Sequence, residues 1–167
     1  MNIETPILVE IFRDISFTKE ESILIAPKFE KIQLKKGHTL LQANDVVYNQ
    51  YYVSSGCLRT YFMDKSGKEH TLQFAIKDWW ISDYTAFFTT TKAAMTIECI
   101  QEAIVYKISK KDVESLYAHI PKIETLFRKK WRKVMQPYRI EFSLVYPNQQ
   151  KKDTSLLSVR IQTLNRV

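Results

Sequence analysis

The sequence predicts an α+β chain that is mainly β, built as a jelly roll (a double-stranded β-helix) with helices at both ends. Two patterns carry this prediction. Beyond Phe29, short runs rich in Tyr, Val, Phe, Ile and Thr alternate with turn residues, and many short strands at even spacing are typical of a barrel or jelly roll. On either side of this region, apolar residues recur at the three- and four-residue spacing of helices.

Before the strands, two short helices are expected. Thr18 and Glu21 stand three residues apart, which is the spacing of a capping box at the start of a helix. The earlier helix is expected from Pro6 to Ile15, where apolar residues follow a helical period: Ile7, Leu8, Ile11, Phe12 and Ile15. The chain should therefore enter the barrel from a helical segment.

The predicted strands are separated by turn residues. Residues 57–63 and 70–76 are expected to pair as a hairpin, and residues 95–100 and 103–108 as a second, later pair. Four turn signals divide the region: Lys36-Gly37, Asn44-Asp45, Ser54-Ser55-Gly56 and Asp64-Lys65-Ser66-Gly67.

After the strands, helices return. Ser109 is expected to cap a helix over residues 110–117, and Pro121 to open a longer helix, about 122–142. Pro137 should kink this helix or end it early. One apolar stripe follows it: Ile123, Leu126, Phe127, Trp131, Val134, Met135, Tyr138 and Phe142. We therefore expect one domain over residues 1–142 and a short tail, residues 143–167, with material for one strand or helix at most.

The composition is that of one ordered domain. The 167 residues are 45% hydrophobic and include only 3 Gly and 5 Pro, so neither disorder nor a low-complexity linker is indicated. The chain lacks a basic start followed by a long apolar run, and it lacks any long uninterrupted apolar stretch. We therefore expect a cytoplasmic protein that does not enter a membrane.

Residues that carry metal or covalent chemistry are few. Cys57 and Cys99 form no CxxC pair and are expected to be free thiols, and His38, His70 and His119 are isolated from one another. A metal-dependent cupin needs clustered histidines, and nucleotide hydrolysis of the P-loop kind needs a glycine-rich loop. Because the sequence contains neither, we expect no enzymatic activity, no metal and no cofactor.

The net charge of +7 lies in the C-terminal part of the chain. Residues 1–121 hold 14 basic and 15 acidic side chains, whereas residues 122–167 hold 11 basic and 3 acidic ones. Such a basic segment can meet nucleic acid or another polyanion. The solvated face of a helix is the ordinary alternative.

Several motifs resemble the cyclic nucleotide-binding domain of the Crp/Fnr regulators. Residues 34–37 (LKKG) and 40–42 (LLQ) look like that family's first strand and turn, and residues 51–59 (YYVSSGCLR) are similar to its "YfVxsGxlR" hairpin. The motifs GKE and TLQF, at residues 67–74, and DWWISDY, at residues 78–84, resemble a branch of the family common in Bacteroidetes. The resemblance covers about residues 7–142 and implies a sensory domain.

In nucleotide-binding members, the resemblance implies a phosphate-binding cassette, in which a Gly-Glu pair opens a short helix and an Arg-Ser/Thr-Ala run closes the segment. Here Ile81 stands at the glycine, Ser82 at the glutamate and Lys92-Ala93-Ala94 at the closing run. Ile81 would crowd the phosphate, Ser82 is too short to reach the ribose, and lysine lacks the bidentate fork of arginine. We therefore expect a degenerate cassette that does not bind cyclic AMP.

The candidate ligand pocket combines this cassette with its aromatic neighbours. Its residues are Trp79, Ile81, Ser82, Asp83, Tyr84, Phe87, Phe88, Lys92, Ala93 and Ala94. Two interpretations stay open: the pocket holds a different, more apolar effector, or its aromatic side chains fill the barrel and leave no room for a ligand.

The long helix leads to two further expectations about partners. A homodimer is expected through Ile123, Phe127, Lys130, Trp131 and Val134, with packing of this stripe on its own barrel as the alternative. Because the tail shows no helix-turn-helix, DNA binding should be weak and non-specific at most.

The sequence thus favours a Crp/Fnr-like effector-sensing regulatory domain. The alternatives are a DNA-binding Crp/Fnr transcription regulator and a truncated remnant of one.

Overall fold

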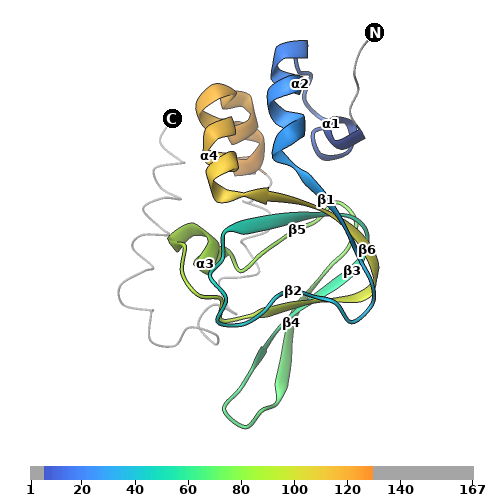
Figure 1. The fold of residues 1–167 in the computed structure, drawn as a ribbon, viewed down its shortest axis with the longest axis vertical. Coiled ribbons are helices and arrows are strands. Elements are labelled where there is room, and N and C mark those ends of the chain that lie inside the picture. The colour runs from blue at the N-terminus through green and yellow to red at the C-terminus, as the bar shows by residue number, and fades with distance from the viewer. Residues whose placement is uncertain (1–5, 130–167) are drawn as a thin grey trace. The chain divides into compact units, whose positions relative to one another are not determined.

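The computed structural model describes residues 6–129, and the chain divides into two compact units, Met1–Ile120 and Pro121–Val167. The first unit is a β-barrel with helices α1, α2 and α4 at one end (Figure 1). In the second unit, residues 121–129 are helical. The expected continuation of this helix to about residue 142, the kink at Pro137 and the tail 143–167 lie outside the described residues.

Two short helices precede the barrel, as predicted: α1 (Pro6–Ile11) and α2 (Lys19–Ile25), which leads into the 3-10 turn η1 (Ala26–Lys28). The capping box is confirmed, because the Thr18 hydroxyl accepts from the Glu21 amide at 3.2 Å and the Glu21 carboxylate accepts from the Thr18 amide at 2.8 Å. α1 ends earlier than the expected Ile15, whose amide donates to the Phe12 carbonyl in a turn.

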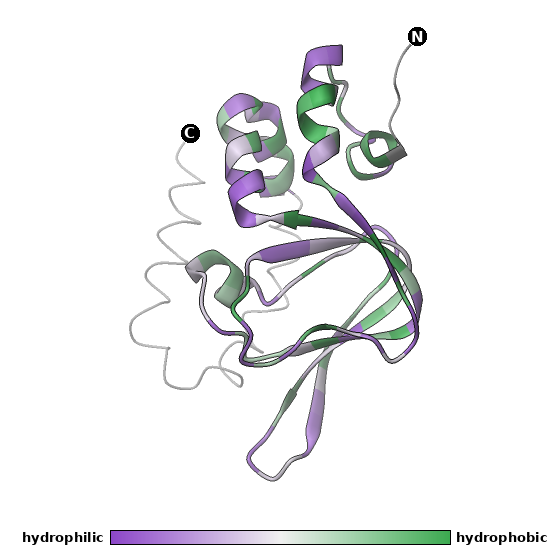
Figure 2. Cartoon of the chain, in the orientation of Figure 1, coloured by the Kyte–Doolittle hydropathy of each residue, from purple (hydrophilic) through white to green (hydrophobic). Residues whose placement is uncertain are grey.

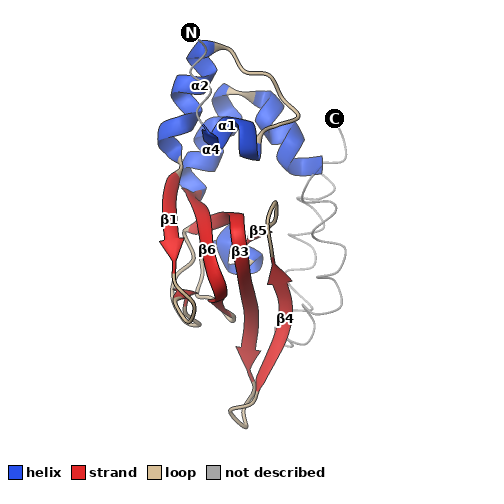
Figure 3. Ribbon diagram, turned by 90° about the vertical axis from the view of Figure 1, so that its right-hand side faces the viewer, coloured by secondary structure: helices blue, strands red, loops and turns tan. Residues whose placement is uncertain are grey.

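Six antiparallel strands form the barrel: β1 (Glu30–Leu34), β2 (Thr39–Leu41), β3 (Asn49–Met63), β4 (Glu69–Ala75), β5 (Trp80–Ile81) and β6 (Thr96–Ser109). Their order is β1-β6-β3-β4, with β2 paired to β6 and β5 paired to β3. Figure 3 shows the four strands of this path side by side. The predicted jelly roll is confirmed, and its fully buried core includes Leu34, Val53, Leu58, Ile97 and Val105.

Two local predictions are wrong. Residues 54–56 do not form a turn, and residues 95–108 do not form a hairpin, because β3 and β6 each run through these positions as one long strand. Three register shifts in the β3–β6 pairing, between Val53 and Leu58, let the two strands bend without ending. Gly56 has a φ of +85°, and a Cβ there would lie 2.2 Å from the Glu102 carbonyl oxygen. The turn-like residues therefore mark a bend of the barrel wall.

The predicted hairpin between β3 and β4 is confirmed. The Asp64 carboxylate accepts from the Ser66 amide at 2.8 Å and from the Lys68 amide at 3.1 Å. Gly67 has a φ of +83°, which glycine adopts at little cost. The tip of this hairpin is hydrophilic (Figure 2), as expected for a turn that projects into water.

The helix after the barrel, α4 (Lys110–His119), begins where predicted and runs two residues further. The Ser109 hydroxyl accepts from the Asp112 amide at 3.0 Å, which confirms the N-cap. In the second unit, Ile123 and Phe127 are buried. Lys130, Trp131 and Val134 of the expected dimer surface lie outside the described residues.

Candidate functional site

The candidate pocket begins where β5 pairs with β3. Tyr51 lies opposite Ile81, and Tyr52 lies opposite Trp80. Successive side chains of a strand point to opposite faces, so Ile81 and Trp80 are buried on different sides of the sheet. Trp79 is 44% exposed. Of these two candidate pocket residues, Ile81 is therefore buried and Trp79 lies at the surface.

The aromatic members of the candidate pocket come together on α3 (Tyr84–Thr89). The Tyr84 and Phe88 rings stack at 6.1 Å between centroids, and the Phe87 ring meets Phe88 edge-on at 5.5 Å. Tyr84 and Phe87 are buried, and Phe88 is half-buried. The three rings therefore form one packed cluster.

The polar residues at the start of the cassette are buried and engaged. Ser82 is fully buried, and its hydroxyl donates to the Asn49 carbonyl of β3 at 2.9 Å. Asp83 is also fully buried and is the N-cap of α3. Its carboxylate accepts from the Ala86 amide at 3.2 Å and from the Ala94 amide at 2.9 Å. One side chain thus joins the start of α3 to the end of the cassette.

The closing run of the cassette is exposed at Lys92 and buried at Ala93. Lys92 is exposed and forms an isolated β-bridge with Val46, whereas Ala93 is buried and Ala94 half-buried. The lysine that reaches α3 is Lys110, whose Nζ donates to the Phe88 carbonyl at 2.6 Å and to the Thr90 hydroxyl at 2.9 Å. This contact could not be predicted from the sequence, because 22 residues separate Lys110 from Phe88.

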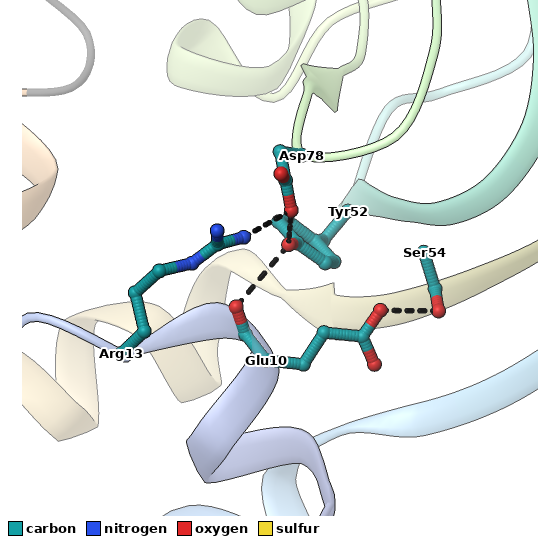
Figure 4. A network of polar contacts seen from close by, with 5 residues as sticks. All are labelled: Glu10, Arg13, Tyr52, Ser54 and Asp78. Atoms are coloured by element: carbon teal, nitrogen blue, oxygen red, sulfur yellow. Dashed lines mark hydrogen bonds and ion pairs between the residues drawn. The ribbon is translucent and has the colours of Figure 1, made fainter.

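Five polar residues join α1 to the chain just before the cassette (Figure 4), and we call them the polar clamp: Glu10, Arg13, Tyr52, Ser54 and Asp78. The Tyr52 hydroxyl donates to Asp78 at 2.6 Å, and its oxygen lies 3.3 Å from the Glu10 carbonyl oxygen. Arg13 pairs with Asp78, and Ser54 donates to the Glu10 carboxylate. The clamp links α1, β3 and the turn between β4 and β5.

The environment of the clamp shifts two pKa values. Burial, and the hydrogen bond to Asp78, raise the pKa of the Tyr52 hydroxyl, which therefore keeps its proton. The same hydrogen bond, together with the charge of Arg13, holds the pKa of the Asp78 carboxyl below its usual value. Within the clamp, the carboxylate of Asp78 thus meets one neutral donor, Tyr52, and one cation, Arg13. Tyr52 and Asp78 both lie within motifs that carried the resemblance, but their contact could not be predicted from them.

Two buried polar side chains on β3 were missed by the sequence reasoning. Thr60 and Gln50 are fully buried, and neither the Thr60 hydroxyl nor the two amide atoms of Gln50 have a hydrogen-bond partner among the residues that the structure describes. Thr60 lies opposite Gln73 of β4. Period-two alternation with the buried Leu58 would have placed Thr60 on the same face as that residue.

A surface pocket of about 290 Å³ lies away from the cassette, at the bend of the barrel wall. Its lining residues are Gln33, Ser55, Glu102, Ala103 and Ile104. Because Gln33 and Glu102 are exposed, this pocket does not shield a ligand from water.

Within residues 6–129, no three His, Cys, Asp or Glu side chains gather in a way that could hold a metal ion. Among the helices described there, none has the length and apolar character needed to cross a membrane. Cys57 and Cys99 are free, as expected, and burial raises the pKa of both thiols.

The barrel and the short helix between β5 and β6 form a fold of the cyclic nucleotide-binding type. The chain belongs to the cyclic nucleotide-binding domain family, whose model matches residues 31–119. No curated protein sequence matches it.

Solved structures with the same fold include an activator protein and a kinase regulatory subunit. The catabolite activator protein of Thermus thermophilus is 15% identical, with a TM-score of 0.63 over 84% of this chain and 63% of that one. DNR from Pseudomonas aeruginosa is 18% identical, with a TM-score of 0.63 over 86% of this chain and 63% of that one. The regulatory subunit of a cAMP-independent protein kinase A from Trypanosoma brucei is 14% identical. Its TM-score is 0.63, over 82% of this chain and 49% of that one. This chain spans less than two thirds of each of these proteins.

Proposed function

We propose that this chain is an effector-sensing regulatory domain of the Crp/Fnr kind, which acts by binding and whose cassette does not take cyclic nucleotides. The burial of the two residues at the Gly-Glu positions is the observation that supports this most directly. Ile81 and Ser82 are fully buried, and Ser82 is bonded to Asn49. A phosphate and a ribose would have to displace packed side chains at both positions.

The charges of the cassette support the same proposal. The carboxylate of Asp83 is fully buried in the segment, whereas Lys92 is exposed. An anion that entered the cassette would therefore lie beside the buried carboxylate of Asp83, whereas the charge of Lys92 stays at the surface. Lys92 would also offer a single point charge instead of the two parallel hydrogen bonds of an arginine.

The aromatic cluster favours a filled barrel. Ile81, Tyr84 and Phe87 are at most 4% exposed, so these side chains already occupy the interior next to the cassette. One observation favours the second candidate, a sensor of a small apolar effector. Within residues 6–129, the buried Thr60 hydroxyl has no hydrogen-bond partner, and a ligand with one polar atom would satisfy it.

Isothermal titration calorimetry with cyclic AMP and cyclic GMP tests this proposal. We expect no binding to the wild-type chain, because loss of a buried, hydrogen-bonded charge contact costs roughly 2–5 kcal/mol, which is at least tenfold in affinity. The matched variant carries Ile81→Gly, Ser82→Glu and Lys92→Arg, which introduce the glycine, glutamate and arginine of the nucleotide-binding members at these three positions. A dissociation constant of about 10 μM or tighter for the wild-type chain would overturn the proposal.

We also propose a homodimer through the helix that begins after Ile120. Because Ile123 and Phe127 are already buried within one chain, the contact would depend mainly on Lys130, Trp131 and Val134. The excess of basic residues after Pro121 supports only weak DNA binding, since phosphate contacts carry no sequence information.

A further inference from the structure

Asp83 holds the two ends of the cassette together. Its Oδ1 accepts from the Ala86 amide at 3.2 Å, and its Oδ2 accepts from the Ala94 amide at 2.9 Å. These two amides are eight residues apart in the sequence, and Asp83 is fully buried. Both oxygens of one carboxylate are thus used to close a loop of the chain.

This arrangement goes beyond an ordinary helix cap. The caps at Thr18 and Ser109 accept from an amide in the first turn of their own helix, and a cap needs no more than that. Asp83 makes this bond with Ala86 and then a second bond with Ala94, which lies beyond the end of α3 at Thr89. A cap alone would not require the second bond.

The loop that Asp83 closes is tied to the rest of the barrel unit. The Thr91 amide donates to the Ala86 carbonyl at 3.0 Å, and Ala93 exchanges backbone bonds of 2.8 Å with the segment at Asn44 and Asp45. Lys110, the first residue of α4, donates to the Phe88 carbonyl. Opening of the loop would therefore disturb the contact that joins α3 to α4.

We infer that Asp83 is an internal anion that keeps the cassette closed and occupies the amides that an anionic effector would need. The inference rests on the proposed function, and it deepens it by naming a ligand class: any effector of this domain is neutral. An added anion would find the Ala86 and Ala94 amides taken and a buried negative charge beside them. The closed conformation needs no phosphate, because the chain supplies the carboxylate itself.

Two substitutions of Asp83 test the bond to Ala86 and the bond to Ala94 separately. Asp83→Asn leaves one acceptor oxygen, and asparagine is a good N-cap, so the bond to Ala86 can persist while the bond to Ala94 is lost. Asp83→Ala removes both bonds. Asp45→Asn makes the same chemical change as the first variant at an exposed carboxylate nearby, and it serves as the control.

Amide hydrogen exchange of the full chain, measured by mass spectrometry, reads out the closure. For Asp83→Asn we expect exchange at residues 91–94 to rise at least about tenfold, with residues 84–89 little changed. For Asp83→Ala we expect both segments and the start of α4 to exchange faster, and 50 mM formate, but not chloride, to restore protection. Asp45→Asn should match the wild type.

Unchanged exchange at residues 91–94 in Asp83→Asn would overturn the inference. Loss of protection in Asp83→Ala that formate does not restore would also overturn it, because side-chain packing and not the anion would then hold the loop. If the alanine variant fails to fold, the asparagine variant decides. Binding of cyclic AMP by the wild-type chain would refute the proposed function through a separate measurement, so the two failures can be told apart.

Discussion

The Tyr52 hydroxyl donates a 2.6 Å hydrogen bond to the carboxylate of Asp78, across 26 residues of sequence. Asp78 has a φ of +72°, and its turn is held to β3 by two backbone bonds between Val53 and residues 78 and 79, at 2.9 and 2.8 Å. Arg13 of the segment after α1 pairs with the same carboxylate (Figure 4). The turn that leads into the cassette is therefore fixed from two sides.

Asp78→Asn should weaken the fold in a pH-dependent way. The pKa of Asp78 is lowered by Tyr52 and by Arg13 and Lys77, so its contribution to stability is present above the unfolded pKa of about 4 and is lost as the pH falls through the folded value. Because this ion pair is partly exposed, we expect about 1 kcal/mol or less at pH 7.

Urea unfolding of the wild type and Asp78→Asn at pH 7 and at pH 3 measures this contribution. Asp14→Asn, an exposed carboxylate on the turn after Arg13, is the control. The clamp also contains the carboxylate of Glu10, which is common to all three proteins. A difference between the wild type and Asp78→Asn that grows at low pH would contradict the assignment.

Gly56→Ala should destabilise the barrel far more than Gly37→Ala. Both glycines have a φ of +85°, which costs a non-glycine residue about 1–3 kcal/mol. Only at Gly56 would the new Cβ also meet backbone, 2.2 Å from the Glu102 carbonyl oxygen, whereas at Gly37 nothing lies within 4 Å. Thermal unfolding should separate the variants, and equal melting temperatures would show that the bend at Gly56 is looser than described.

Gln50→Met should stabilise the fold by about 1–3 kcal/mol, because it keeps a similar side-chain volume and removes buried amide atoms that lack hydrogen-bond partners in the described part of the chain. Chemical denaturation measures the change. Gln33→Met, on an exposed position of β1, should leave the free energy of unfolding nearly unchanged. Destabilisation by Gln50→Met would indicate that an internal water or ligand satisfies the amide.

Multi-angle light scattering at about 50 μM protein should report a dimer, because an apolar stripe on a helix is commonly covered by its twin. Trp131→Asp should dissociate it by placing a charge in that stripe. Lys129→Asp, at an exposed position of the same helix, is the control for charge alone. A wild-type monomer at this concentration would refute the proposed dimer.

DNA binding should be weak, equal for two unrelated duplexes, and steeply weaker at 200 mM salt than at 50 mM salt. The basic residues after Pro121 supply phosphate contacts, and release of counterions makes such binding salt-dependent. Fluorescence anisotropy titrations provide the measurement. A preference of about a hundredfold for one palindromic site would show direct readout of bases and contradict this prediction.

Features set by neighbours in the chain were predictable. The capping box of Thr18 and Glu21, the Ser109 cap and the Asp64 turn all appear as expected, because each is decided within about five residues. The placement of Ile81, Ser82 and Asp83 in a phosphate-binding cassette stays a prediction. That Asp83 would bond to Ala94 was not predicted, because the approach of these residues depends on how the chain folds back after α3.

The sequence by itself determined the mainly β fold and the helices at both ends, since these follow from local spacing and residue type. Only the tertiary structure decided that Gly56 bends a continuous strand, that Arg13 meets Asp78, and that Lys110 reaches α3. A glycine with positive φ serves a turn or a bend equally well, and the pairing of β3 with β6 chooses between them. Likewise, an aspartate and an arginine 65 residues apart form a pair only when the packing of α1 against the barrel brings them together.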